Sequence, residues 1–246
     1  MSGQRVALVT GASGGIGRAT ALALAANGLA VACGFGTNEA GAKETVELIE
    51  SAGGRAAAFG ADVGEETQVD ELFRQIIEWA GTPLVLVCNA GSNRDGLTVK
   101  FPTAEFERIV NTNLTGAFLC SRRALPGMLK ARWGRIVHVS SAVALRGNAG
   151  QVAYAASKTG LLGLMRTLAI EYGSRGITTN AICPGFIETG MTATLPKKAR
   201  DDLLRKIPAD RFGSVEEIAA TIRFLSSGEA SYVNGAVVPV DGGMTA

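Results

Sequence analysis

The chain has 246 residues, of which 47% are apolar, and its formal net charge is +2 at pH 7. So many apolar residues can build a buried core, which excludes a disordered chain. The balanced charge excludes the strongly basic composition of most nucleic-acid-binding proteins. Glycine is frequent, with 32 residues, whereas histidine occurs once, at His138. A Ser-His-Asp triad and a multi-histidine metal site both need histidines in defined places, so neither is expected.

Short apolar runs predict seven strands, at residues 6–9, 29–33, 55–59, 84–88, 136–139, 178–182 and 236–240. Helical periodicity between them predicts helices at about 16–27, 39–52, 66–80, 103–130, 152–173 and 214–226. Alternating strands and helices form βαβ units, and strands that are apolar on both sides are covered by helices on both faces. The pattern therefore predicts one α/β domain over 1–246, with a doubly wound parallel sheet of about seven strands.

The end of the first predicted strand has the pattern of a dinucleotide-binding turn. Residues 10–18 read T-G-A-S-G-G-I-G-R, and a predicted helix follows at once. Gly11, Gly15 and Gly17 allow a tight turn, close approach of backbone N–H groups to a pyrophosphate, and close packing of helix on sheet. A glycine-rich turn between a strand and a helix at this point indicates a Rossmann-type cofactor site.

The end of the second predicted strand bears on the choice between NAD and NADP. NAD-specific folds of this type place an acidic residue there to bind the ribose 2′-hydroxyl. Residues 33–38 read C-G-F-G-T-N, and the first acid is Glu39. A 2′-phosphate would meet no carboxylate at this strand end, so the sequence favours NADPH. The nearest positive side chain is Arg18, one turn into the first helix.

A tyrosine and a lysine lie one turn apart on a predicted helix, at Tyr154 and Lys158. An ammonium beside a phenol would lower the pKa of the tyrosine from about 10 toward neutrality, where it can donate or accept a proton. Such a pair is common on helices, so the pair alone does not indicate catalysis. Its position relative to the predicted sheet has to support a catalytic role. Ser140 and Ser141 follow the fifth predicted strand, at the carboxyl edge where parallel sheets bind ligands.

Four features together resemble the short-chain dehydrogenase/reductase family, and the resemblance covers residues 6–243. They are the T-G-x-x-x-G-x-G turn, the Asn89-Ala90-Gly91 segment, a serine thirteen residues before the tyrosine, and the Y-x-x-x-K pair. The resemblance implies a catalytic tetrad of Asn113, Ser141, Tyr154 and Lys158. Tyr154 would protonate the developing alkoxide as hydride leaves the nicotinamide, and Ser141 would hold the substrate carbonyl. Lys158 would bind the nicotinamide ribose and lower the pKa of Tyr154, while Asn113 would fix a helix kink and a water in the proton relay.

The same resemblance implies cofactor contacts along the carboxyl edge of the sheet. These residues are Gly11, Ser13, Gly15, Ile16, Gly17, Arg18, Thr37, Asp62, Val63, Asn89, Ala90, Gly91, Tyr154, Lys158, Pro184, Gly185, Ile187 and Thr189. Asp62 and Val63 would contact the adenine, and the segment 184–189 would cover the nicotinamide. Two positions depart from the family pattern. Gly14 stands where many NADP-using relatives carry Arg, and Gly190 stands where Asp is frequent.

Within the family, residues 93–95, 148–151, 184–189, 210–213 and 240–244 are most similar to the 3-oxoacyl-[acyl-carrier-protein] reductases of fatty acid biosynthesis. The resemblance implies NADPH-dependent reduction of a 3-oxoacyl thioester. Alternatives with the same tetrad are a polyketide ketoreductase, an acetoacetyl-CoA reductase and a sugar dehydrogenase. A cofactor-binding regulator without activity would carry a damaged tetrad, and all four positions are filled here.

The resemblance also implies partners. Acyl carrier protein is acidic, and Arg132 and Arg175 match the family's docking positions, with Lys130 and Arg94 as helpers, beside the expected mouth of the site. Exposed basic residues are often only solvated surface, and that alternative stays open. The small and apolar residues of the helices at 103–130 and 152–173 fit the pairing faces of the family's usual homotetramer.

Other sequence features indicate the cellular compartment of the protein. No two of the four cysteines have C-x-x-C spacing, and each lies in an apolar stretch, so buried free thiols in a reducing compartment are expected. No signal-peptide pattern and no apolar run of 18 residues occur. These features predict a soluble cytoplasmic protein. The least regular stretch, about 186–213, is expected to be a substrate flap, and the alternative is an ordinary solvated connection.

Overall fold

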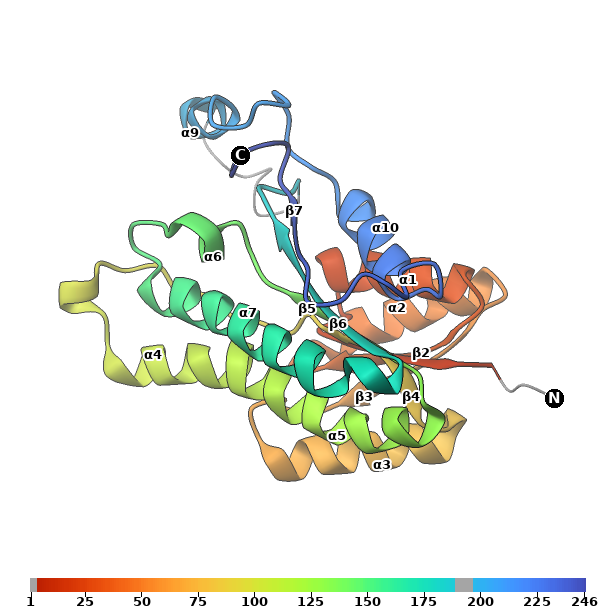
Figure 1. Cartoon of the computed structure of the whole chain (residues 1–246). Helices are drawn as coiled ribbons and strands as arrows, with labels where there is room; N and C mark the ends of the chain where they lie inside the picture. Colours follow the sequence, from red (N-terminus) through yellow and green to blue (C-terminus); the bar gives the residue numbers. More distant parts are fainter. Residues whose placement is uncertain (1–3, 189–196) are drawn as a thin grey trace.

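Each predicted apolar run forms a strand, and the seven strands build one parallel sheet in the computed structural model, which describes residues 4–188 and 197–246 (Figure 1). The strands are β1 (Val6–Thr10), β2 (Ala30–Phe35), β3 (Arg55–Gly60), β4 (Pro83–Cys88), β5 (Gly134–Val139), β6 (Ile177–Pro184) and β7 (Val237–Val240). Their spatial order is β3-β2-β1-β4-β5-β6-β7. The order reverses between β1 and β4, which opens the crevice where such sheets bind ligands. The expected doubly wound fold is confirmed.

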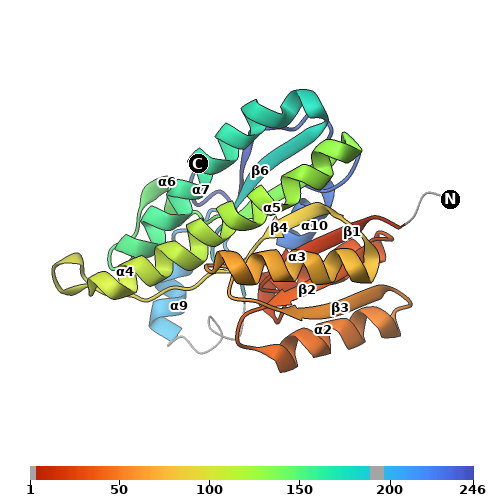
Figure 2. The same cartoon turned by 90° about the horizontal axis from the view of Figure 1, so that it is seen from below.

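Helices cover both faces of the sheet, because successive strand side chains enter two different apolar clusters. Leu8 and Ile136 face the helices α3, α5 and α7, whereas Val9 and Val137 face α1 and α10. Figure 2 shows α3, α5 and α7 crossing in front of the strands. The longer helices are α1 (Gly15–Ala26), α2 (Glu39–Ser51), α3 (Glu66–Ala80), α4 (Thr103–Val110), α5 (Gly116–Ala131), α7 (Val152–Tyr172) and α10 (Val215–Leu225). The shorter ones are η1 (Thr98–Lys100), α6 (Val143–Arg146), η3 (Gly173–Arg175) and α9 (Lys197–Leu204).

The single helix predicted over 103–130 is divided in the structure. A π-helical segment, Asn111–Thr115, separates α4 from α5. Such segments are rare and widen one turn of the helix, often at functional sites. The hydrophobic periodicity continues across the segment, which is why the sequence pattern did not reveal it.

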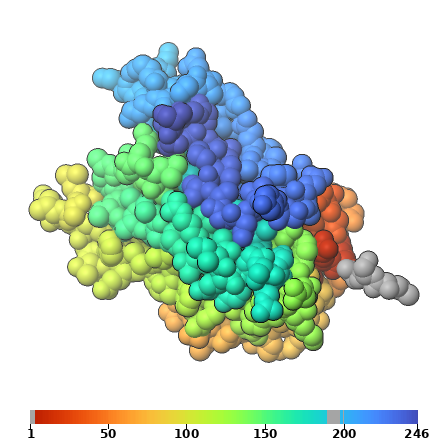
Figure 3. Space-filling model, in the orientation of Figure 1, coloured from red at the N-terminus to blue at the C-terminus, as the bar shows by residue number. Residues whose placement is uncertain are grey.

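The stretch 186–213 has described residues at both ends. The backbone N–H of Glu188 donates to the carbonyl of Gly213 at 2.8 Å, and the N–H of Gly213 donates to Phe186 at 3.0 Å. The helix α9 between them was not predicted, because few apolar residues mark it. The C-terminal segment lies against this stretch (Figure 3), with Ala209 donating to the carbonyl of Gly242 at 3.0 Å. The function of 186–213 as a flap stays a prediction.

The four cysteines are buried free thiols, and burial raises the pKa of each, in Cys33 to about 12. His138 is buried in β5, within the strand predicted at 136–139, and burial is the main cause that lowers its pKa to about 4. Over residues 4–188 and 197–246, no helix has the length and apolar character needed to cross a membrane.

We predict that Ile136→Ala lowers the free energy of unfolding by about 2–5 kcal/mol, because Ile136 is fully buried at the centre of the sheet. Ile77→Ala is the matched control, since Ile77 is 39% exposed on α3. Urea unfolding followed by circular dichroism measures both. Equal losses in the two variants would contradict the assignment of this cluster as the main core.

Candidate active site

A network of hydrogen bonds joins the glycine turn after β1 to the loop after β4. The hydroxyl of Thr10 accepts the backbone N–H groups of Asn89 and Ala90, each at 3.0 Å. The amide Nδ2 of Asn89 donates to the carbonyls of Thr10 and Gly11 at 3.0 and 3.1 Å. The side chain of Asn89, expected at the cofactor, is thus used to brace the turn. Thr10 is the first residue of the T-G-x-x-x-G-x-G motif, but its bonds to the loop after β4 were not predicted, because they depend on residues 79 and 80 positions away.

Glycine is required at two positions of this turn. A Cβ at Gly17 would collide with the carbonyl oxygen of Gly11, so the helix α1 approaches the turn as closely as a residue without a side chain allows. Gly11 itself has φ +69°, which L-residues with a side chain rarely adopt. The turn therefore presents its backbone and the N-terminus of α1 to the crevice, as the binding of a pyrophosphate requires.

A cavity of about 590 Å³ opens beside this turn. Its lining brings together seven of the expected cofactor residues, Gly11, Ser13, Thr37, Asp62, Val63, Ala90 and Gly91. The lining also contains Phe35, Gln68, Arg108 and Thr112, which were not predicted. The backbone N–H of Asp62 donates to Gln68 Oε1 at 2.9 Å, and one carboxylate oxygen accepts the N–H of Gly64 at 2.9 Å. The size and wall of this cavity fit the adenosine half of a dinucleotide.

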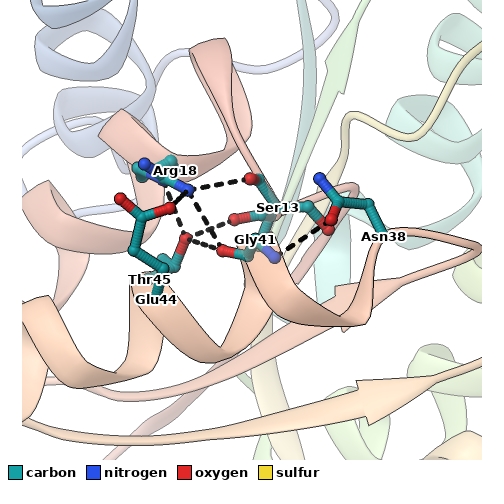
Figure 4. A network of polar contacts seen from close by, with 7 residues as sticks. Ser13, Arg18, Asn38, Gly41, Glu44 and Thr45 are labelled. Carbon is teal, nitrogen blue, oxygen red and sulfur yellow. Dashed lines mark hydrogen bonds and ion pairs between the residues drawn. The ribbon is translucent and has the colours of Figure 1, made fainter.

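Arg18 is held by the start of α2 (Figure 4). Its Nη2 donates to the carbonyls of Ser13 and Gly41 at 3.0 and 3.2 Å and forms an ion pair with Glu44 at 2.6 Å. Its Nε donates to the hydroxyl of Thr45 at 3.1 Å. These contacts fasten the glycine turn to α2. Direct contact of Arg18 with a cofactor stays a prediction.

Asn113 lies in the π-helical segment and is buried, with every polar atom of its side chain paired. Its Oδ1 accepts the backbone N–H of Ser92 at 2.7 Å, and its Nδ2 donates to the carbonyl of Ser92 at 3.0 Å. The same Nδ2 donates to the hydroxyl of Ser157 at 3.0 Å, which in turn donates to the carbonyl of Tyr154 at 2.9 Å. The Asn113 amide thus joins the loop after β4 to the tyrosine-bearing helix α7.

Lys158 is buried on the same helix. Its Nζ donates to the carbonyl of Val139 at 2.8 Å and lies 5.6 Å from the centroid of the Tyr154 ring. Burial lowers the pKa of Lys158 to about 8. A Cβ at Gly91 would lie 3.3 Å from this Nζ and 3.3 Å from Asn113 Oδ1, which places the loop after β4 directly beside the lysine.

Tyr154 has its pKa raised by burial, and a hydrogen bond with Ser141 offsets only part of that rise. Lys158 is not among the causes that shift the pKa of Tyr154 in this structure, and the expectation that it lowers that pKa stays a prediction. The ammonium is directed to the carbonyl of Val139, and loss of hydration of the phenolate is the larger effect. Tyr154 consequently remains a phenol at neutral pH, the form that donates a proton.

The segment after β6 completes the edge of the sheet. The carbonyl of Pro184 accepts the N–H of Ala142 at 2.9 Å, next to Ser141, and the N–H of Gly185 donates to Val240 at 3.1 Å. Ile187 is buried. Thr189 lies outside the described residues. Gly15 and Ile16 begin α1, directly beneath the glycine turn.

Arg132 and Arg175 lie together, but at the opposite edge of the sheet from Tyr154. Arg132 ends α5 just before β5 begins, and Arg175 stands just before β6. The expectation that they flank the mouth of the site within one chain is wrong, because parallel strands carry the residues that precede them to the amino edge. Neither residue forms an ion pair within the described parts of the chain.

Comparison with known proteins agrees with this geometry. A family model described as Enoyl-(Acyl carrier protein) reductase matches residues 11–245, which include the glycine turn and all four tetrad positions. The chain belongs to the short-chain dehydrogenase/reductase family. It is accordingly an oxidoreductase that uses a nicotinamide cofactor.

Individual relatives match over nearly the full chain. The 3-oxoacyl-[acyl-carrier-protein] reductase of Pseudomonas aeruginosa is 48% identical over 240 residues, which cover 98% of this chain and 97% of that protein. The enzyme of the same name from Thermotoga maritima is 42% identical, with the same coverage of 98% and 97%. The solved structure of a putative gluconate dehydrogenase from Agrobacterium tumefaciens has a TM-score of 0.94 at 35% identity, over 99% of this chain and 97% of that one.

We predict that the affinity for a nicotinamide cofactor falls as pH rises above about 8. Lys158 loses its proton there, and with it the charge that strengthens hydrogen bonds to ribose hydroxyls. Between pH 8 and 9.5 the association constant should fall by up to about tenfold per pH unit. Calorimetric titration at constant ionic strength measures it. Lys158→Met should bind more weakly at pH 7 and show no such fall, and an equal fall in both proteins would contradict the role of Lys158.

Proposed function

We propose that the protein reduces the 3-oxo group of an acyl thioester carried on acyl carrier protein, with NADPH as reductant, in fatty acid biosynthesis. The observation that carries the proposal is the meeting of three tetrad residues at the carboxyl edge. Asn113 bonds to Ser157, whose hydroxyl donates to the carbonyl of Tyr154, and Lys158 Nζ lies 5.6 Å from the centroid of the Tyr154 ring. The names of the relatives at 42–48% identity support the substrate class.

Ser141, Tyr154 and Lys158 have separate roles in the proposed reaction. When bound, the cofactor supplies the hydride that reduces the carbonyl carbon. The hydroxyls of Ser141 and Tyr154 bind the carbonyl oxygen, and Tyr154 transfers its proton to that oxygen as negative charge develops on it. Burial keeps Tyr154 protonated until this moment. Lys158, with its pKa lowered to about 8, can exchange a proton near neutral pH, and with its Nζ 5.6 Å from the centroid of the Tyr154 ring it restores the proton of the tyrosine.

The preference for NADPH rests on the wall of the cavity. Residues 34–38 line it without a carboxylate, and the helix α2 begins directly beyond them, capped by Asn38 at 3.0 Å from the N–H of Gly41. The positive end of a helix favours a phosphate. We assign the pyrophosphate to the glycine turn, the adenine to Asp62 and Val63, and the nicotinamide ribose to Tyr154 and Lys158.

A second candidate is the oxidation or reduction of a sugar acid or related carbonyl, favoured by the similarity to the solved structure of a putative gluconate dehydrogenase. The tetrad would be the same in that enzyme. Polyketide and acetoacetyl-CoA reductases remain alternatives for the same reason. The substrate-side loops, and not the tetrad, distinguish these activities.

The proposed assembly is a cytoplasmic homotetramer. Support comes from apolar side chains left exposed on the long helices, Phe118 on α5 and Ile170 on α7. Four buried free thiols suit a reducing compartment. Because Arg132 and Arg175 lie at the amino edge, a carrier protein bound there delivers its acyl group to the active site of another subunit.

We predict that the wild-type protein oxidises NADPH faster than NADH with acetoacetyl thioesters, and faster with the carrier protein thioester than with that of coenzyme A. The absorbance of the reduced cofactor measures these rates, and oxidation of glucose and gluconate with NADP+ completes the panel. A protein that oxidises gluconate and leaves thioesters unchanged would contradict the proposed substrate class.

Tyr154→Phe removes the proton donor and should lower kcat about 10²–10⁴-fold. The affinity for NADPH, measured by fluorescence titration, should change little, because the ring and its packing remain. Turnover near the wild-type rate would contradict the assigned proton donor.

Charge reversal at Arg132 and Arg175 should raise KM for the carrier protein thioester at low salt. It should leave KM for the coenzyme A thioester unchanged, since the charges act on the acidic carrier and not on the acyl group. Charge reversal at Lys43, which is exposed on α2, is the control. A wild-type KM for the carrier protein thioester in the Arg132 and Arg175 variant at low salt would rule out this docking surface.

A further inference from the structure

The first turn of α7 carries Tyr154 but has no side-chain cap. The helix begins at Val152, and no side chain bonds its free N–H groups. The first turn of a helix frays unless it is held, because its N–H groups lack partners within the helix. Tyr154 is in this turn, so the contacts of Gln151, the residue that precedes the helix, contribute to its position beside the bond from Ser157 to the Tyr154 carbonyl.

Gln151 is held by the loop after β4. Its Nε2 donates to a carboxylate oxygen of Asp95 at 3.0 Å, and the same oxygen accepts Nδ2 of Asn93 at 2.8 Å. Next to this pair, the N–H of Gly96 donates to the carbonyl of Gly150 at 2.8 Å, and Gly96 and Gln151 form an isolated bridge. In Figure 1 this loop passes beside the N-terminal end of α7.

The base of the same loop is fixed at the other side of the site. Ser92 is bonded through both its N–H and its carbonyl to the side chain of Asn113. Four residues after Ser92, the loop reaches the start of α7. One short segment, 92–96, therefore spans from the asparagine of the tetrad to the helix turn that carries Tyr154.

We propose that Asp95 is a positioning residue for the proton donor. Its carboxylate orients Gln151, and Gln151 fixes the first turn of α7 so that Tyr154 faces Ser141. A carboxylate is suited to this task, because it accepts several hydrogen bonds at once and is favourable beside the N-terminus of a helix. The kinetic test of this inference rests on the proposed function, because it measures thioester reduction. The structural test, by amide hydrogen exchange, rests on the hydrogen bonds alone.

The kinetic test distinguishes an effect on the position of Tyr154 from an effect on the binding of thioester or NADPH. Asp95→Ala should lower kcat for thioester reduction roughly tenfold, the size of effect expected for one lost bond to a charged acceptor. KM for the thioester and the affinity for NADPH should stay within about threefold, because neither ligand is proposed to touch Asp95. Asp95→Asn keeps an acceptor oxygen and should retain most of the activity. Asp70→Ala makes the same charge change on the exposed face of α3 and serves as the control.

An exchange of the two partners gives the sharper test. Gln151→Glu places two carboxylates together and should lower kcat at pH 8 at least as much as Asp95→Ala, with partial recovery at lower pH as a proton is shared between them. The double variant D95N/Q151E restores a hydrogen bond of reversed direction and should recover activity at pH 8. A double variant no more active than Gln151→Glu alone, or a wild-type kcat in Asp95→Ala, would overturn the proposal.

Hydrogen exchange gives a readout without turnover. In Asp95→Ala, the amides of 152–156 should exchange faster than in the wild type, while those of β4 and β5 stay protected. If the wild-type protein reduces no thioester, the proposed function fails, and this exchange still decides the structural role of Asp95. Unchanged exchange at 152–156 would overturn it.

Discussion

The site depends on one buried amide, that of Asn113. Its oxygen and nitrogen pair with the N–H and the carbonyl of Ser92, and its nitrogen also reaches Ser157 on α7. A buried amide left unpaired costs about 1–3 kcal/mol per group, so these contacts are held together or lost together. They fix the loop after β4, the widened helix turn and the tyrosine-bearing helix in one arrangement, and Gly91 and Lys158 meet beside it.

Burial is the largest cause of the pKa shifts of both Tyr154 and Lys158. It raises the pKa of Tyr154 and lowers that of Lys158 to about 8. Both shifts favour the neutral form, as expected when charged groups lose water. Tyr154 is thereby kept as a phenol, and Lys158 can exchange a proton near neutral pH. The same desolvation keeps the neighbouring Cys88 a thiol.

Much of this arrangement could be predicted from the sequence, because it is encoded locally. Apolar runs predicted all seven strands, and the spacing of Gly11, Gly15 and Gly17 predicted the turn that the structure shows. What could not be predicted depends on distant contacts. The widened turn at 111–115 contains Asn113, whose side chain bonds to Ser92, 21 residues away. The direction of the Tyr154 pKa likewise depends on how deeply the fold buries it, which motif spacing does not report.

The most direct test of this account is the rate of thioester reduction by Asn113→Asp. The new side chain still accepts the N–H of Ser92 but no longer donates to Ser92 or Ser157, and its charge faces a carbonyl. We predict a fall in kcat of about 100-fold, equivalent to about 2.7 kcal/mol, together with a fall of about 1–3 kcal/mol in the free energy of unfolding, because the carbonyl of Ser92 loses its buried donor. A wild-type kcat in this variant would contradict the claim that the Asn113 amide holds the site together.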